Sequence, residues 1–198
     1  MLDLIAFDAD DTLWHSEIHY VEVQRRFRAL LDPYGVADQA DRRLIETEQR
    51  NLACYGYGVK GFTLSLVETA IELTGSRISG AEIRHILDWA RDILLAPVAL
   101  LDGAEAVVSR LAVKRALMLI TKGDLHHQER KIAQSGLRDY FRHIEIVSEK
   151  SRETYAQILA RRGVDPASFL MVGNSMRSDI LPVLELGGWG VHLSLIHI

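Results

Sequence analysis

Two carboxylates and a hydroxyl lie two residues apart just after a short apolar run. The run Leu4–Phe7 is typical of a buried strand, and Asp8 ends it abruptly. Asp10 and Thr12 follow at intervals of two residues. Carboxylates this close repel one another, and a hard cation such as Mg2+ between them offsets the repulsion. Asp8 is also a candidate nucleophile, because carboxylates form acyl-phosphate intermediates. The alternative is an acidic turn in which Thr12 caps a helix.

Apolar runs in the second half of the chain alternate with helical patterns. They predict strands at 116–120, 144–147, 169–172 and 189–193. Strands joined by single helices are typical of a parallel sheet covered on both faces. Together with the first strand, they predict an α/β fold built on a doubly wound, Rossmann-like sheet of five parallel strands.

The segment after the first strand is helical in pattern throughout. Helices are predicted at 18–31, 43–52, 63–74 and 79–95, the last opened by a capping box of Ser79 and Glu82. A second capping box, Asp102 with Glu105, is predicted to open a later helix, and the last helix is predicted at 180–186. We therefore predict a core domain of residues 1–14 and 98–193, with an all-helical domain, 15–97, inserted after the first strand.

Open parallel sheets bind ligands at the carboxyl ends of their strands. The polar residues that follow the inner strands are therefore candidates for one shared site. They are Thr121, Lys122 and Gly123 after the second strand, Lys150 after the third, and Gly173, Asn174 and Asp179 after the fourth. Such groups suit a phosphate and a metal ion.

This order of motifs resembles the haloacid-dehalogenase-like (HAD) superfamily of aspartate-nucleophile phosphohydrolases, in its subtype with a helical (C1-type) cap after the first motif. The family's Asp-x-Asp-x-Thr matches residues 8–12, its Thr matches Thr121, and its Lys is placed at Lys150. Its Gly-Asp with a later Asp matches Gly173 and Asp179, with Asn174 where Asp is usual. The resemblance extends to about residue 193.

The resemblance implies a Mg2+-dependent phosphomonoester hydrolase that works through an aspartyl-phosphate. Asp8 would be the nucleophile. Asp10 would protonate the leaving oxygen and then activate water, roles that call for a pKa near the working pH.

The same resemblance assigns residues to the phosphate and to the metal. The residues implied for phosphate binding are Thr121, Lys122, Gly123 and Lys150. The residues implied for Mg2+ are Asp8, Asp10 through its carbonyl, Asn174 and Asp179. An amide oxygen brings no charge to the metal, so Asp179 would supply it; alternatively, Asn174 only caps the following helix.

A segment rich in glycine and aromatic residues, 51–62, interrupts the helical domain. It is either a connection between two helices or a loop that contacts the substrate, since caps supply specificity in similar proteins. In the second case the contacting residues are Tyr55, Tyr57 and Lys60. The expected substrate is a small phosphorylated metabolite.

Composition narrows the other classes of function. The net charge of -4 gives no basic footprint for nucleic acid, and no apolar run is long enough for a membrane span. Cys54 is the single cysteine, so an internal disulfide is excluded and a cytoplasmic location is the default expectation. His15 and His19 have a spacing that can ligate metal, but we expect hinge or surface residues. The oligomeric state is not readable.

Other functions remain to be separated from a phosphatase. A phosphomutase of the same fold stays open, as does a catalytically weak HAD-like interaction module, which rests on Asn174. A haloacid dehalogenase does not need Asp10, because a halide leaves without a proton. A receiver-type switch would carry its phosphorylated Asp after a later strand.

The last six residues, 193–198, are what the DNA string CTG TCT CTT ATA CAC ATC encodes, and this string resembles a transposase mosaic end used as a sequencing adapter. We therefore expect residues 194–198 to be a non-native tail.

Overall fold

A computed structural model describes residues 2–194 of the chain. The predicted tail therefore lies outside the described residues, apart from Ser194. The chain divides into two compact units. Of the described residues, the core unit comprises 2–16 and 97–194, and the helical unit comprises Glu17–Ala96.

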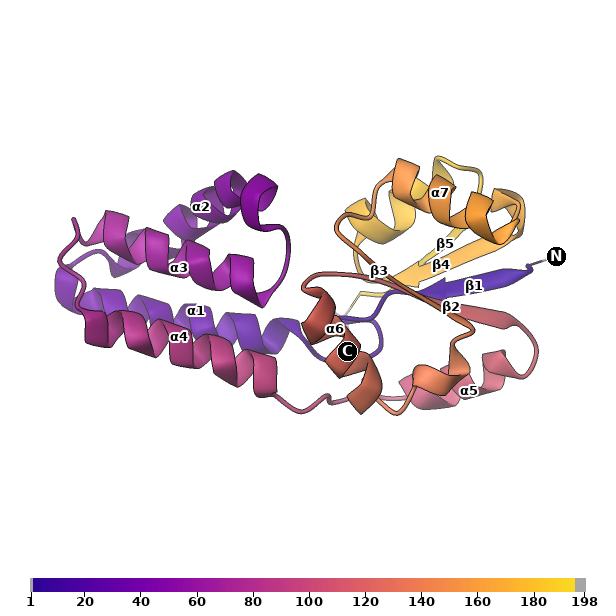
Figure 1. The fold of residues 1–198 in the computed structure, drawn as a ribbon, viewed down its shortest axis with the longest axis horizontal. Helices are drawn as coiled ribbons and strands as arrows, with labels where there is room; N and C mark the ends of the chain where they lie inside the picture. The colour runs from indigo at the N-terminus through magenta and orange to yellow at the C-terminus, as the bar shows by residue number, and fades with distance from the viewer. Residues whose placement is uncertain (1, 195–198) are drawn as a thin grey trace. The chain divides into compact units, whose positions relative to one another are not determined.

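The core unit is built on the predicted parallel sheet. Its strands are β1 (Leu4–Phe7), β2 (Ala116–Lys122), β3 (His143–Val147), β4 (Phe169–Gly173) and β5 (Trp189–His192). All neighbours pair in parallel in the order β3-β2-β1-β4-β5 (Figure 1). The α/β prediction with a five-stranded sheet is confirmed. β1 is central, so its carboxyl end lies between those of β2 and β4.

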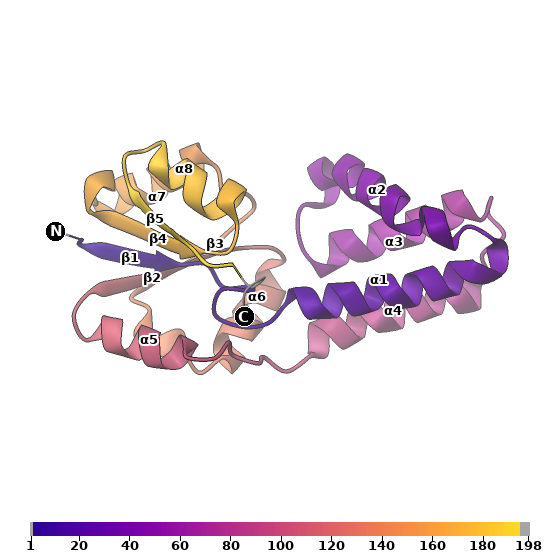
Figure 2. The same ribbon diagram turned by 180° about the vertical axis from the view of Figure 1, so that it is seen from behind.

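Alternation along β1 divides the core between the two faces of the sheet. Ile5 and Phe7 pack with residues of α5 (Ala104–Ala112) and α6 (Leu125–Gln134). Leu4 and Ala6 pack on the other face with residues of α7 (Arg152–Arg162) and α8 (Leu181–Leu184). Figures 1 and 2 show these helix pairs on opposite sides of the strands. Both faces of β1 are therefore buried, and this packing holds in place the strand that ends at Asp8.

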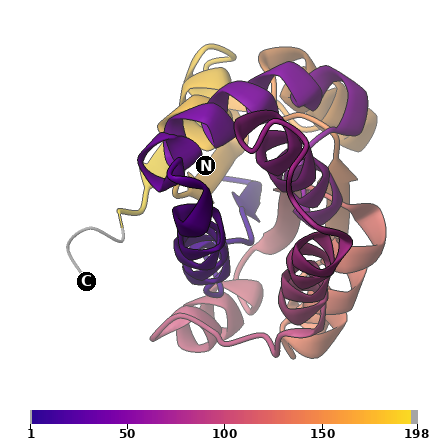
Figure 3. The ribbon, with the colours of Figure 1, turned by 90° about the vertical axis from the view of Figure 1, so that its left-hand side faces the viewer.

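The helical unit has a core of its own. Its helices are α1 (Glu17–Leu31), α2 (Ala40–Tyr55), α3 (Val59–Leu73) and α4 (Gly80–Leu95) (Figure 3). Phe27, Leu44, Leu66 and Ile86 meet in that core, one from each helix. α3 begins four residues before the predicted start, because Gly58, with φ of 124°, turns the chain directly into a helix at the buried Val59.

The two predicted capping boxes have different outcomes. The box of Ser79 and Glu82 is present at the start of α4, with both reciprocal hydrogen bonds formed. The box of Asp102 and Glu105 is wrong. Gly103 is the N-cap of α5, in the left-handed region with φ of 79°, and no side chain caps that helix.

The last helix also differs from the predicted 180–186. A π-helical turn, Met176–Ile180, leads into the short α8. Pro182 has no N–H and cannot bond to the carbonyl of Ser178, as an α-helix would require. The buried Tyr155 hydroxyl donates to that carbonyl instead, at 3.1 Å.

Four short 3-10 turns complete the secondary structure of the described chain. They are Asp32–Tyr34, Ala37–Gln39, Arg138–Tyr140 and Pro166–Ser168. Within residues 2–194, no helix combines the length and the hydropathy needed to span a bilayer.

Replacement of Ser79 by alanine tests the assigned caps. Ser79→Ala should lower the free energy of unfolding by about 1 kcal/mol, because the backbone N–H of Glu82 loses its acceptor. Asp102→Ala should change it by less than about 0.5 kcal/mol, because the exposed Asp102 is not a cap. Urea denaturation of both variants measures this, and equal losses would contradict the assignment.

Candidate active site

The ammonium group of Lys150 contacts two carboxylates, which belong to residues that follow different strands. Lys150 follows β3, and its Nζ donates to Asp8 Oδ1 after β1 and to Asp179 Oδ1, the latter at 2.7 Å. All three side chains are buried, with 3% of Lys150, 7% of Asp8 and 1% of Asp179 exposed. The structure thus brings together three of the predicted site residues.

Asp8 is held from both of its oxygens. Thr12 donates its hydroxyl to Asp8 Oδ2 at 3.0 Å, so Thr12 supports the site and is not a helix cap. Burial raises the pKa of Asp8 from 3.8 to about 6, Lys150 opposes the rise, and the charge of Asp179 adds to it. Burial alone would lower the pKa of Lys150, but the two carboxylates raise it. One lysine thus leaves negative charge uncompensated at Asp8.

Asp10 occupies a separate set of contacts. Its Oδ1 accepts from Trp14 Nε1 at 2.7 Å and from Lys131 Nζ at 2.5 Å, and its Oδ2 accepts from Gln128 Nε2 at 2.8 Å. Burial would raise the pKa of Asp10, but these donors, led by Lys131, outweigh it and lower the pKa. The expectation of a pKa near the working pH is therefore not met, since a cation and two further donors favour the carboxylate form.

Thr121 lies inside β2, not beyond its end as predicted. The strand continues to Lys122, because Thr121 and Lys122 still pair with Ile146 and Val147 of β3. Thr121 Oγ1 is buried and accepts from Gln128 Nε2 at 3.2 Å. Thr121 therefore keeps its own hydroxyl hydrogen for another acceptor.

The side chain of Lys122 contacts residues of the segments that follow β3 and β4. Its Nζ donates to Ser178 Oγ at 3.1 Å and to Glu149 Oε1 at 3.4 Å. Gly123 adopts φ of 135°, and a Cβ at this position would lie 3.1 Å from Gln128 Nε2. A glycine is therefore needed at this bend, which sits against the Gln128 amide.

The loop after β4 is folded around Asp179. Asp179 Oδ2 accepts the backbone N–H of Ser175 at 2.9 Å. A Cβ on Gly173 would lie 2.4 Å from that same oxygen, so only glycine fits there. Asn174 is half-buried beside this loop, and its backbone oxygen lies 2.9 Å from His192 Nε2.

The turn that carries Asp8 and Asp10 depends on Asp11. Asp11 has φ of 57°, a left-handed conformation that Asp tolerates better than most residues. Its backbone N–H donates to the carbonyl of Trp14 at 2.7 Å, and its Oδ1 accepts from the N–H of Ser16 at 2.9 Å. These bonds return the chain so that the Trp14 indole reaches Asp10.

The groups that the motifs imply for Mg2+ are all oxygen donors, the kind of ligand that Mg2+ prefers: the carboxylates of Asp8 and Asp179, the amide of Asn174 and the backbone carbonyl of Asp10. Both oxygens of Asp179 already accept hydrogen bonds, from Lys150 Nζ and from the N–H of Ser175. The raised pKa of Asp8 marks charge that a cation would offset. Within residues 2–194, no cluster of three or more His, Cys, Asp or Glu side chains is arranged for a metal.

Other candidate residues lie outside this cluster. Tyr55 ends α2 and is exposed, Tyr57 is half-buried in the connection to α3, and Lys60 is exposed on α3. All three belong to the helical unit, and their contact with substrate stays a prediction. Cys54 is exposed in the same unit.

Three residues of the site are not among those predicted from the sequence. Trp14, Gln128 and Lys131 all contact Asp10, yet none belongs to a motif. Gln128 and Lys131 are three residues apart on the helix after Thr121, a spacing that puts both on one helix face. The spacing indicates that the two side chains share a face, but it does not indicate that this face meets Asp10.

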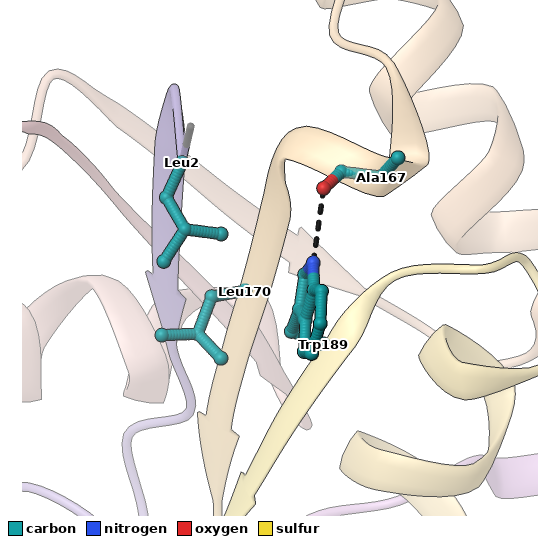
Figure 4. Close-up of a pocket in the computed structure, with 4 residues that line it drawn as sticks. All are labelled: Leu2, Ala167, Leu170 and Trp189. Atoms are coloured by element: carbon teal, nitrogen blue, oxygen red, sulfur yellow. Dashed lines mark hydrogen bonds between the residues drawn. The ribbon is translucent and has the colours of Figure 1, made fainter.

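A separate cavity of about 370 Å³ lies near the opposite, amino-terminal ends of the strands. Leu2, Ala167, Leu170 and Trp189 line it, and Trp189 Nε1 donates to the carbonyl of Ala167 at 2.9 Å (Figure 4). Its lining is mainly apolar, which distinguishes it from the charged site at the carboxyl ends.

Gly173→Ala should destabilise the core unit by about 1–3 kcal/mol, because the new methyl group would displace the Asp179 carboxylate from Ser175. Gly80→Ala is the matched control, since a Cβ there meets no described atom within 4 Å. Urea denaturation compares the variants. A loss in Gly173→Ala no larger than that in Gly80→Ala would refute the close approach.

Residues 2–187 match the family model described as hydrolase, haloacid dehalogenase-like hydrolase. No curated protein sequence matches the chain.

Three solved structures illustrate its relationships. A haloacid dehalogenase-like family hydrolase from Xanthomonas campestris is 46% identical, with a TM-score of 0.94 over 100% of this chain and 83% of that one. The HAD-hydrolase YfnB from Bacillus subtilis, bound to magnesium, is 18% identical, with a TM-score of 0.71 over 97% and 88%. A 2-haloacid dehalogenase from Pseudomonas syringae is 21% identical, with a TM-score of 0.64 over 97% and 86%.

The last two likenesses concern the fold alone. The family model spans nearly the whole chain, and the Xanthomonas structure agrees with it in sequence and in fold. The chain therefore belongs to the haloacid dehalogenase-like hydrolases.

Proposed function

We propose that this hydrolase is a Mg2+-dependent phosphatase that acts on a small phosphomonoester through an aspartyl-phosphate on Asp8. The observation that carries the proposal is the division of labour between two carboxylates on one turn. Asp8 faces Lys150, whereas Asp10 has its own donors from Trp14, Gln128 and Lys131. A hydrolase whose leaving group needs a proton requires the second carboxylate, and a dehalogenase does not.

In the first step an Asp8 oxygen attacks phosphorus. The Asp8 O–P bond forms, the bond from phosphorus to the leaving oxygen breaks, and Asp10 gives its proton to that oxygen. In the second step Asp10, now a carboxylate, takes a proton from water as the water attacks phosphorus. The O–P bond to Asp8 breaks, free phosphate is released, and the Asp8 carboxylate is regenerated.

The surroundings of Asp10 suit the second step directly. Its lowered pKa keeps it a carboxylate, which is the base form. For the first step it must carry a proton. A dianionic phosphate beside it favours this, since nearby negative charge raises the pKa of a carboxyl group.

Fixed hydrogen-bond donors would stabilise the negative charge of the phosphoryl group during its transfer. Lys150 would neutralise oxygens beside Asp8, and Thr121 would donate its hydroxyl to one of them, with the backbone at Lys122 and Gly123. Asp8, the Asp10 carbonyl, Asn174 and Asp179 would hold Mg2+. When bound, the ion supplies positive charge that stabilises and orients the phosphoryl group.

The rest of the substrate is assigned to the helical unit. Tyr55, Tyr57 and Lys60 are proposed to contact it, with the lysine suited to an acidic group and the rings to an apolar or sugar portion. A small phosphorylated metabolite in the cytoplasm is the proposed substrate.

Asp8→Asn should lower the turnover of p-nitrophenyl phosphate by roughly three orders of magnitude or more, because the nucleophile is lost. Asp3→Asn is the control, since Asp3 is exposed before β1. Wild-type activity should vanish in EDTA and return with Mg2+, and free phosphate should be released. Near wild-type turnover by Asp8→Asn would disprove the covalent route, and phosphoryl transfer to a sugar without phosphate release would indicate a mutase.

Asp10→Asn should slow alkyl phosphates by about 10²–10⁴-fold and p-nitrophenyl phosphate much less, because nitrophenolate departs without a proton. The measurement is kcat/KM for one alkyl and one aryl substrate at the same pH. Equal losses on both would remove Asp10 from the role of acid.

A further inference from the structure

Two residues of α6 fasten the carboxylate of Asp10 from outside the family's motifs. Lys131 Nζ lies 2.5 Å from Asp10 Oδ1, and its side chain is 11% exposed. Gln128 Nε2 lies 2.8 Å from Asp10 Oδ2. The two side chains are one helical turn apart and hold different oxygens of the same carboxylate.

The orientation of the Gln128 amide is fixed by its neighbours. Its Nε2 faces three acceptors, namely Asp10 Oδ2, the carbonyl of Lys122 at 2.7 Å and Thr121 Oγ1 at 3.2 Å. The opposite orientation would aim Oε1 at a carboxylate and a carbonyl, which repel it. Gln128 Oε1 is buried and finds no partner among the described residues, so the amide is retained for its donor side.

A buried lysine and a half-satisfied amide are costly for a helix that only packs against a sheet. α6 could cover β2 with apolar residues such as Ile132, which it also presents to the core. The positions of Gln128 and Lys131 carry polar groups that reach Asp10 instead. Their contacts therefore point to a role in the reaction.

We propose that Gln128 and Lys131 are positioning residues, which act through Asp10 by holding its carboxyl group in one orientation toward the leaving oxygen. This inference rests on the proposed phosphatase function. An Asp side chain has two rotatable torsions, and a small displacement of the proton donor is costly to proton transfer. Trp14, on the turn that carries Asp10, donates a third hydrogen bond to the carboxylate. We call Trp14, Gln128 and Lys131 together the clamp.

The two residues should have different kinetic signatures. Lys131 contacts Asp10, so its loss should act on proton transfer and spare phosphate binding. Gln128 contacts both Asp10 and Thr121, so its loss should also weaken the phosphate site. The first readout is the ratio of kcat/KM for an alkyl phosphate to that for p-nitrophenyl phosphate. The second is the inhibition constant of inorganic phosphate.

Lys131→Met should lower the alkyl-to-aryl ratio by about tenfold or more, with the phosphate inhibition constant changed less than about twofold. Lys131→Arg, which keeps a cationic donor, should recover part of the ratio. Gln128→Leu should lower the ratio and also raise the inhibition constant. The matched controls are Lys114→Met and Gln134→Leu, since both residues are exposed, the second on the same helix.

A second background separates positioning from packing. Combined with Asp10→Asn, Lys131→Met should leave the ratio unchanged, because no proton is then transferred by that residue. A ratio that falls further in the double variant, or equal losses on both substrates in the single variant, would overturn the inference. If Lys131→Met does not fold, Gln128→Leu decides by the same criterion.

Failure of the inference differs from failure of the function. An active wild type and a selective Asp10→Asn variant, with Lys131→Met behaving like Lys114→Met, would overturn the clamp and leave the phosphatase standing. A wild type with no phosphatase activity, or an Asp10→Asn variant with no leaving-group effect, would remove both.

Discussion

The sharing of one buried ammonium group by two carboxylates organises the core of this hydrolase. Lys150 reaches Asp8 and Asp179, which leave different strands of the sheet. Removing Lys150 would leave two buried carboxylates with no cation between them, which is strongly unfavourable. The loops after β1, β3 and β4 must therefore close on one another, and the tight fit of Gly173 against Asp179 follows from that closure.

The same turn keeps its two acidic side chains electrically distinct. Burial and the nearby charge of Asp179 outweigh the effect of Lys150 on Asp8, so the pKa of Asp8 is raised. Asp10 has a lysine and two neutral donors, and its pKa is lowered. The neighbours of these two identical residues thus shift their pKa values in opposite directions. Asp11, which follows Asp10 in the turn, has a left-handed backbone conformation. This conformation folds the chain back so that the Trp14 indole can donate to Asp10.

Much of the fold could be predicted because its signals are local. Dry strands with alternating faces, single helices between them and the Ser79 capping box are all written in neighbouring residues. Two predictions failed because the residue concerned interacts with a partner far away in the sequence. The helix after β4 becomes a π-helical turn because Pro182 frees a carbonyl that Tyr155, on α7, takes up. Thr121 stays in β2 because β3 continues to pair with it.

The sequence by itself determined which chemistry the site contains: the Asp-x-Asp turn, the hydroxyl, the lysine and the second acidic loop follow strands that must end at one edge of a parallel sheet. Only the tertiary structure decided how each group is charged and held. Gln128 and Lys131 could be placed on one face of a helix, but no sequence pattern says that this face meets Asp10. That contact depends on how α6 packs against β2, and packing is settled by the shapes of residues far apart in the chain.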